Sequence, residues 1–126
     1  MLGHPALLCT PCLRDVSATA RRVADEYAAA MVAFFEAGIA LTKASQGNAW
    51  YAKTEAARGD MRVSPETFAR AWAAAKAEGG EKAVLVGMRD RLDEAAEDMR
   101  AAELRYLAAA PELEAARAAL GEPVEV

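Results

Sequence analysis

Residues 85–106 read LVGMRDRLDEAAEDMRAAELRY, and the spacing within this stretch decides the fold. Small or apolar residues recur alternately three and four positions apart, at Leu85, Met88, Leu92, Ala95, Met99, Ala102 and Tyr106. This set, named the seam, averages about 3.5 residues per repeat and predicts a helix that packs one narrow stripe against another helix. Because two of its members are alanines, we expect a closely approaching neighbour, as in the wall of a bundle.

The composition also indicates helices. Roughly a quarter of the 126 residues are alanine, whereas aromatic residues make up only 6%. Alanine has the highest helix propensity, and a sheet protein would contain more β-branched and aromatic residues. A chain of this length is typical of one domain with a modest core of its own.

Charge is distributed unevenly along the chain. Residues 1–80 carry nine basic and eight acidic side chains, whereas residues 81–126 carry six basic and eleven acidic ones. The acidic last third repels phosphate groups, so nucleic acid and anionic membranes are disfavoured as its partners.

Start and stop signals divide the chain into helices. Asn48 is placed to cap a short helix that stops near Gly59, and Ser64-Pro65 opens the next one with a capping hydroxyl and a proline in the first turn. Two glycines, Gly79 and Gly80, end that helix. We therefore predict an all-α antiparallel helical bundle. Its parts are an irregular segment (1–14), a single bundle domain (15–120) with two long helices (about 15–45 and 81–110), two shorter helices between them and a short C-terminal helix after Pro111, and a tail (121–126).

The first long helix carries an unusually broad apolar face, which suits burial against more than one neighbour. Together with the aromatic residues of the two short helices, this face predicts binding to another protein, either a second copy or a larger assembly. The candidate partner-binding residues are Tyr27, Met31, Phe34, Phe35, Ile39, Trp50, Tyr51, Phe68 and Trp72.

The sequence also predicts a cytoplasmic protein with no membrane partner. The most apolar run, Ala28 to Leu41, contains Glu36 and falls short of the roughly 18 to 20 uninterrupted apolar residues of a membrane span. The N-terminus lacks the basic region, apolar stretch and small-residue cleavage site of a signal peptide.

Cys9-Thr10-Pro11-Cys12 is a Cys-x-x-Cys pair with three interpretations: a redox disulfide, two zinc ligands, or small apolar groups that only pack. His4 adds a third candidate zinc ligand, and two chains can share one tetrahedral ion. A thioredoxin-like site also requires a β-α-β context, which the sequence does not offer. Zinc is therefore a possible cofactor, and no other is indicated.

Residues 63–70, VSPETFAR, resemble the entrance to the recognition helix of helix-turn-helix proteins. The resemblance implies DNA contacts by Ser64, Thr67 and Arg70. Arg58 and Arg62 are further candidate DNA contacts because they add to a local basic surface. Arg62 replaces the glycine expected just before Val63, and a capped amphipathic helix explains the same residues.

No spacing typical of an enzyme site occurs: the chain has one histidine, no glycine-rich phosphate loop and no Glu-x-x-His pair. We therefore expect a non-enzymatic interaction or assembly protein that binds through apolar helix faces. The alternatives are a helix-turn-helix DNA-binding protein with a helical dimerisation arm, and a small zinc or thiol-redox protein using Cys9 and Cys12.

Overall fold

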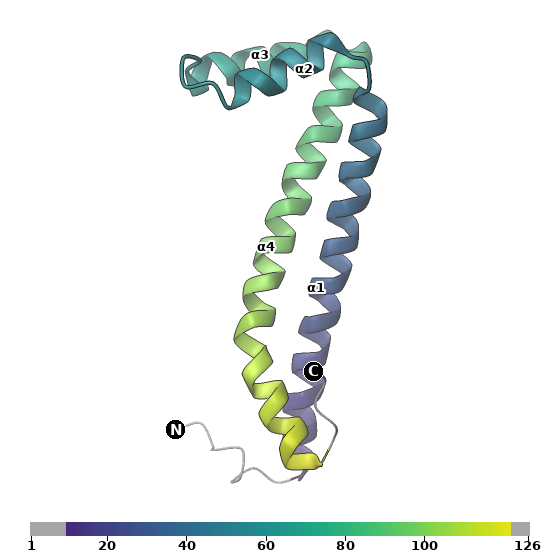
Figure 1. Cartoon of the computed structure of the whole chain (residues 1–126), viewed down its shortest axis with the longest axis vertical. Helices are drawn as coiled ribbons and strands as arrows, with labels where there is room; N and C mark the ends of the chain where they lie inside the picture. Colours follow the sequence, from purple (N-terminus) through teal and green to yellow (C-terminus); the bar gives the residue numbers. More distant parts are fainter. Residues whose placement is uncertain (1–9, 122–126) are drawn as a thin grey trace. The chain divides into compact units, whose positions relative to one another are not determined.

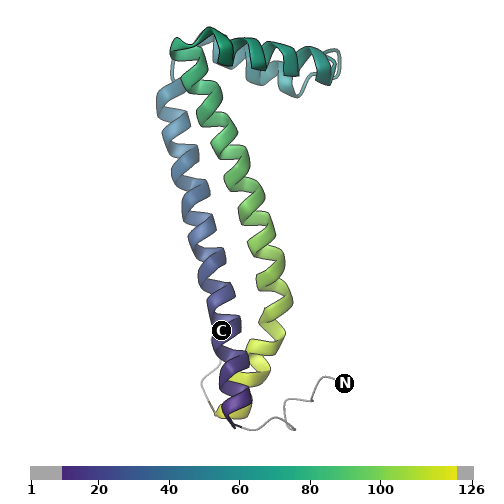
Figure 2. The same cartoon turned by 180° about the vertical axis from the view of Figure 1, so that it is seen from behind.

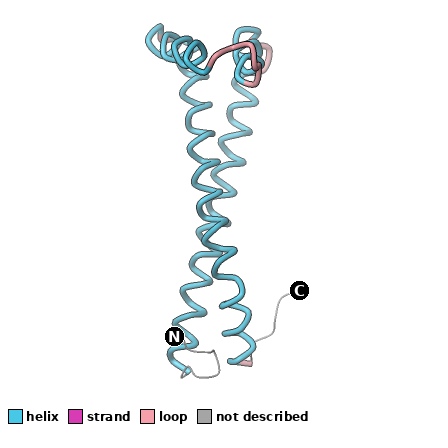
Figure 3. Tube along the Cα trace, turned by 90° about the vertical axis from the view of Figure 1, so that its left-hand side faces the viewer, coloured by secondary structure: helices cyan, strands magenta, loops and turns pink. Residues whose placement is uncertain are grey.

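The structure is a computed structural model that describes residues 10–121. In this part of the chain it is all-α, which confirms the predicted class. The described residues form four helices joined by short loops (Figure 3): α1 (Thr10–Ser45), α2 (Ala49–Arg58), α3 (Pro65–Glu78) and α4 (Gly80–Leu120).

Contacts within the chain define two compact units. Unit 1 contains residues up to Val32 and from Glu97 onward, and unit 2 contains residues 33–96. In each unit a segment of α1 runs antiparallel beside a segment of α4 (Figures 1 and 2). The single domain over residues 15–120 stays a prediction.

In unit 1, small side chains let the two helices approach closely. Ala20, Ala102 and Ala116 are almost fully buried. Tyr27 stacks on Tyr106 with ring centroids 5.3 Å apart, and its hydroxyl donates a hydrogen bond of 3.0 Å to Glu103. Aromatic stacking between two alanine-rich stretches fixes the register of this pair.

In unit 2, the core joins all four helices. It consists of Leu41, Tyr51, Trp72, Ala75, Leu85 and Val86, with Trp50, Phe68, Met88 and Leu92 packed around it. All seven seam residues are buried or partly buried, as the spacing of residues 85–106 predicts. Full burial of Leu85 and Val86 contributes roughly 1.5–3 kcal/mol each.

The short helices begin where their capping residues predict. The side chain of Asn48 accepts a hydrogen bond of 2.8 Å from the Tyr51 backbone, and Ser64 accepts one of 3.1 Å from the Thr67 backbone. The reversal into α4 uses Gly79 and Gly80 at φ angles of 78° and 70°, a conformation that only glycine adopts without cost.

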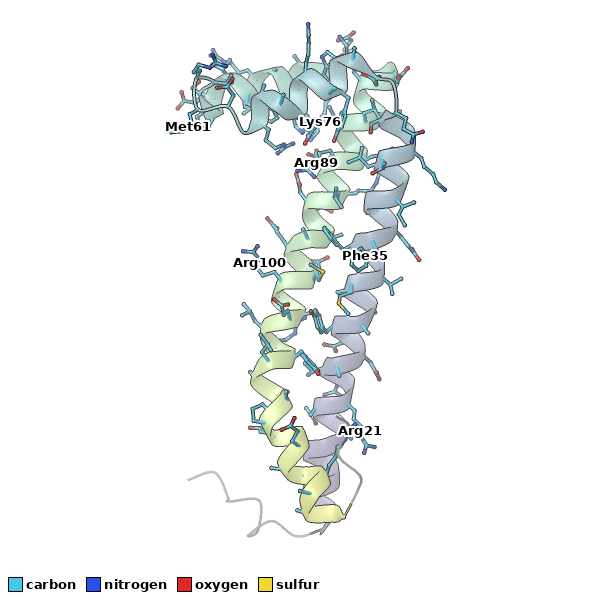
Figure 4. The ribbon with its side chains drawn as sticks, viewed as in Figure 1. Arg21, Phe35, Met61, Lys76, Arg89 and Arg100 are labelled. Atoms are coloured by element: carbon cyan, nitrogen blue, oxygen red, sulfur yellow. The ribbon has the colours of Figure 1, made fainter. Side chains whose placement is uncertain are left out.

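α2 and α3 lie side by side across one end of the α1–α4 segments of unit 2 (Figure 1). They pack against the beginning of α4 through the core and through ion pairs such as Lys76–Asp90. Within unit 2, a face of α1 stays exposed. Met61, in the turn between α2 and α3, is fully exposed (Figure 4).

Two predicted boundaries are wrong. α1 begins at Thr10, so residues 10–14 are helical and not irregular, because Pro11 in the first turn costs no intrahelical hydrogen bond. α4 continues through Pro111 to Leu120 instead of ending near Ala110. Ala116 beyond the proline is 1% exposed, so packing holds this segment in the helix.

Candidate interaction surface

The broad apolar face of α1 is divided by the structure into an inner and an outer part. The inner residues Tyr27, Met31 and Phe34 are partly buried, each within its own unit. The outer residues are Phe35, which directly follows Phe34, and Ile39, one helical turn later. They are 60% and 57% exposed. Phe35 is labelled on α1 in Figure 4. Of the predicted partner-binding residues, these two are the large apolar side chains that unit 2 leaves mostly in solvent.

The four predicted aromatic residues of α2 and α3 belong to the core. Tyr51 and Trp72 are 8% and 9% exposed, and Trp50 and Phe68 pack partly buried against them. Phe68 and Trp72 stack on each other at 5.2 Å. The structure thus places them where they hold the short helices to α4.

Around Phe35 and Ile39 the surface of α1 is hollowed. The hollow has a volume of about 450 Å³ and is lined by Phe34, Phe35, Gly38, Ile39, Thr42, Lys43 and Gln46. Gly38 lacks a side chain at its centre, and a Cβ atom there would meet only Leu92, at 3.9 Å. The predicted partner-binding residues do not include Gly38, Thr42, Lys43 or Gln46. Of these, Thr42 and Gln46 directly follow the inner positions Leu41 and Ser45, a spacing that is visible in the sequence.

Two charged side chains accompany the hollow on α1. Lys43 lines it, and Glu36 lies two helical turns earlier on the same side of the helix. Both side chains are exposed, and neither forms an ion pair within residues 10–121. The surface therefore combines apolar side chains with one charge of each sign along one flank.

A polar network joins α2, α3 and α4 in unit 2. The indole Nε1 of Trp72 donates a hydrogen bond of 2.8 Å to Asp90, which also pairs with Lys76. Burial opposes ionisation of Asp90, but the bonds from Lys76 and Trp72 outweigh it and hold its pKa below the usual value. The Arg58 guanidinium lies 4.8 Å from the centroids of both the Phe68 and the Trp72 ring.

A second part of this network surrounds Tyr51. Burial, together with the nearby Glu55, raises the pKa of its hydroxyl to about 12, and Arg89 opposes this rise. The buried Nε of Arg89 lies 3.4 Å from Glu55 in a geometry that gives an ion pair but no hydrogen bond. Asp93 pairs with Arg89 and Arg58. These groups neutralise one another, as in a structural network.

The predicted DNA-contacting residues are largely engaged within the chain. Ser64 and Thr67 hydrogen-bond each other at the start of α3, and Arg62 pairs with Asp60. Arg58 is held by Glu55, Asp93 and the two rings, and Arg70 is exposed. Helix-turn-helix motifs cross at about 90–120° after a turn of 3–4 residues. Here α2 and α3 lie side by side and are joined by residues 59–64.

The predicted metal ligands His4 and Cys9 lie outside the described residues. Cys12 lies in α1, and its side chain is also outside the description. In the part of the chain that is described, no three His, Cys, Asp or Glu side chains are grouped to hold a metal ion. The zinc and thiol hypotheses therefore stay predictions.

Within residues 10–121, one helical segment is long and apolar enough to cross a membrane by length and composition. It is the part of α1 from Ala18 to Ser45, which reaches a mean hydropathy of 1.3, and only 6% of its most apolar stretch is buried. The expectation of no membrane partner rests on the lack of an uninterrupted apolar run, whereas this segment reaches its hydropathy although it contains charged residues such as Glu36. Core helices and N-terminal signal sequences meet the same criterion.

Comparison of the chain with protein-family models, curated proteins and solved structures finds no match.

Proposed function

We propose that the chain is a non-enzymatic helical interaction protein that assembles with protein through the exposed face of α1. One observation carries this proposal: Phe35 and Ile39 are more than half exposed around the hollow in α1. Burying such side chains in an interface contributes roughly 1.5–3 kcal/mol each before the costs of association. Contiguous exposed apolar surface on a small protein is typical of an interaction site.

The proposal places the chain in the cytoplasm, with protein and not lipid covering α1. Glu36 and Lys43 support this choice because both lie on the exposed apolar side of the helix. Charged side chains within membrane-spanning helices are rare and costly. An interface between proteins can pair the two charges instead.

A photo-crosslinking experiment tests the proposal. Benzoylphenylalanine replaces Phe35 in one variant, and replaces the exposed Glu94 of α4 in a control. We expect protein adducts at position 35, in purified protein or in a lysate of the source cells, that an excess of unmodified chain suppresses. An excess of the Phe35→Ser/Ile39→Ser double variant should not suppress them.

Two results would contradict the proposal. One is the absence of protein adducts at position 35 in both samples. The other is an adduct yield at position 94 equal to that at position 35, because contact would then be indiscriminate.

A further inference from the structure

In unit 2, α1 carries two apolar stripes separated by one residue. The inner stripe, Phe34, Gly38, Leu41 and Ser45, is buried or partly buried, whereas the outer stripe, Phe35, Ile39, Thr42 and Gln46, is exposed at every position. Both stripes alternate steps of three and four residues, the spacing of a helix-packing seam. One residue corresponds to a rotation of about 100° around a helix of 3.6 residues per turn. Helices of four-helix bundles contact two neighbours on faces separated in this way.

The hollow on the outer stripe has the geometry of sites that receive side chains from a facing helix. In helix packing of this kind, a knob enters a hole made by four residues at positions i, i+3, i+4 and i+7. Phe35, Gly38, Ile39 and Thr42 form one such set, and Ile39, Thr42, Lys43 and Gln46 form the next. Together with Phe34 they are the residues that line the hollow.

The charges beside the hollow select the direction of the facing helix. In a parallel pair of identical helices, Glu36 and Lys43 lie opposite Met31 and Gly38 of the second copy, so neither charge meets a charged partner. In an antiparallel pair centred near Ile39, Glu36 lies at the level of Lys43 of the second copy. A two-fold axis repeats this contact, so both charges on both chains are paired.

We propose that the exposed face of α1 binds a second copy of this chain, antiparallel, about a two-fold axis near Ile39. Ile39 of each copy enters the hole of Phe35, Gly38, Ile39 and Thr42 on the other. Phe35, one turn earlier, then reaches the next hole, one turn further along the opposite helix. The same register brings Glu36 level with the second copy's Lys43. This inference rests on the proposed function and names its partner.

Charge reversal on the intact chain tests the arrangement. Glu36→Lys places two lysine pairs across the interface, and Lys43→Glu places two glutamate pairs. We expect each variant alone to raise the dimer dissociation constant about tenfold, measured by sedimentation velocity at low salt. An equimolar mixture of the two variants pairs opposite charges again and should associate as tightly as the wild type. The double variant E36K/K43E should do the same.

Matched controls separate the interface from general charge effects. Glu94→Lys on α4 and Lys53→Glu on α2 make the same charge changes at exposed positions away from the hollow. They should leave dimer dissociation unchanged. Circular dichroism of every variant verifies that the helices are retained.

Three outcomes would overturn the inference. Unchanged dimerisation in both single variants indicates a parallel pair or another surface, because neither charge then lies opposite a charged side chain of the second copy. A strict monomer up to about 100 µM excludes a self-partner of ordinary affinity. A third outcome is a monomer that binds anionic or zwitterionic vesicles. If Ile39→Ser abolishes this binding, the exposed face of α1 contacts lipid and not a second copy. If photo-adducts at position 35 still form with a different protein, the proposed function stands while this inference fails.

Discussion

At the scale of single residues, Trp72 combines two roles. Its ring is part of the unit 2 core, and its indole nitrogen holds Asp90 on α4. Its aromatic character could be recognised in the sequence, but its burial could not, because a short amphipathic helix does not show which partner covers it. The exposed Phe35 and the buried Trp72 look alike in sequence and differ only through the packing of α2 and α3.

Loss of the indole hydrogen bond should destabilise unit 2 measurably. We expect Trp72→Phe to lower the free energy of unfolding by about 1–2 kcal/mol, because the lost bond has a charged acceptor. Urea denaturation measures this change. In an Asp90→Ala background the same substitution should cost clearly less, since the bond is already absent. Equal costs in the two backgrounds would contradict the role of this bond.

Tyr51 predicts an alkaline dependence of stability. Its ordinary pKa is 10.0, and in the folded chain burial raises it to about 12. The fold therefore favours the protonated hydroxyl, a contribution that is complete below pH 10 and is lost as the pH rises to 12. We expect stability to fall less over this range in Tyr51→Phe than in the wild type. Chemical denaturation at pH 10 and pH 12 measures the free energy of unfolding of both proteins. An equal decrease in the variant and the wild type would contradict the raised pKa of Tyr51.

At the scale of helices, local signals were read well and long-range consequences were not. Asn48 and Ser64 cap helices through hydrogen bonds to residues three positions away, and Gly79 ends α3 through its positive φ angle. These signals are local, which is why the sequence shows them. Pro111 predicts a helix end because proline has no backbone N–H to donate, yet packing beyond it keeps the helix continuous. The outer stripe of α1 escaped notice because one broad apolar face does not reveal where an intramolecular neighbour stops covering it.

Asn48 joins two helices through the two ends of its amide. Its oxygen caps α2, and its nitrogen donates to Glu81 at the start of α4. We expect Asn48→Ala to lower the free energy of unfolding by about 1–2 kcal/mol. Asn48→Asp keeps the cap but removes the donor beside Glu81, so its destabilisation should ease when the pH is lowered to 4. Thermal denaturation at pH 7 and pH 4 checks both effects. If the destabilisation caused by Asn48→Asp were the same at both pH values, the contact between Asn48 and Glu81 would be contradicted.

At the scale of the whole molecule, the proposed dimer makes the melting temperature depend on how many chains associate. A dimer that forms only from folded chains raises the melting temperature with protein concentration. The sequence predicts the class of fold and an apolar interaction face on the first long helix. It does not predict the stoichiometry, because the same apolar spacing serves neighbours within a chain and between chains.

Ile39 and Leu41 offer a matched pair on α1 for this effect. Ile39 is 57% exposed and Leu41 is 5% exposed. We expect Ile39→Ser to remove the concentration dependence of the melting temperature while changing the stability of the dilute protein by less than about 0.5 kcal/mol. Leu41→Ser should lower the melting temperature at every concentration. A concentration dependence that persists in Ile39→Ser, measured by calorimetry from low to high micromolar, would contradict the role of this face.

The turn that carries Met61 has a practical consequence for such measurements. A fully exposed side chain between two helices is surrounded by solvent, and loop tips of this kind tolerate insertions well. A fluorophore or short peptide tag attached at this position should leave the packing of α2 and α3 intact. Labelled chains would then report subunit exchange by energy transfer between dyes, without any alteration of α1.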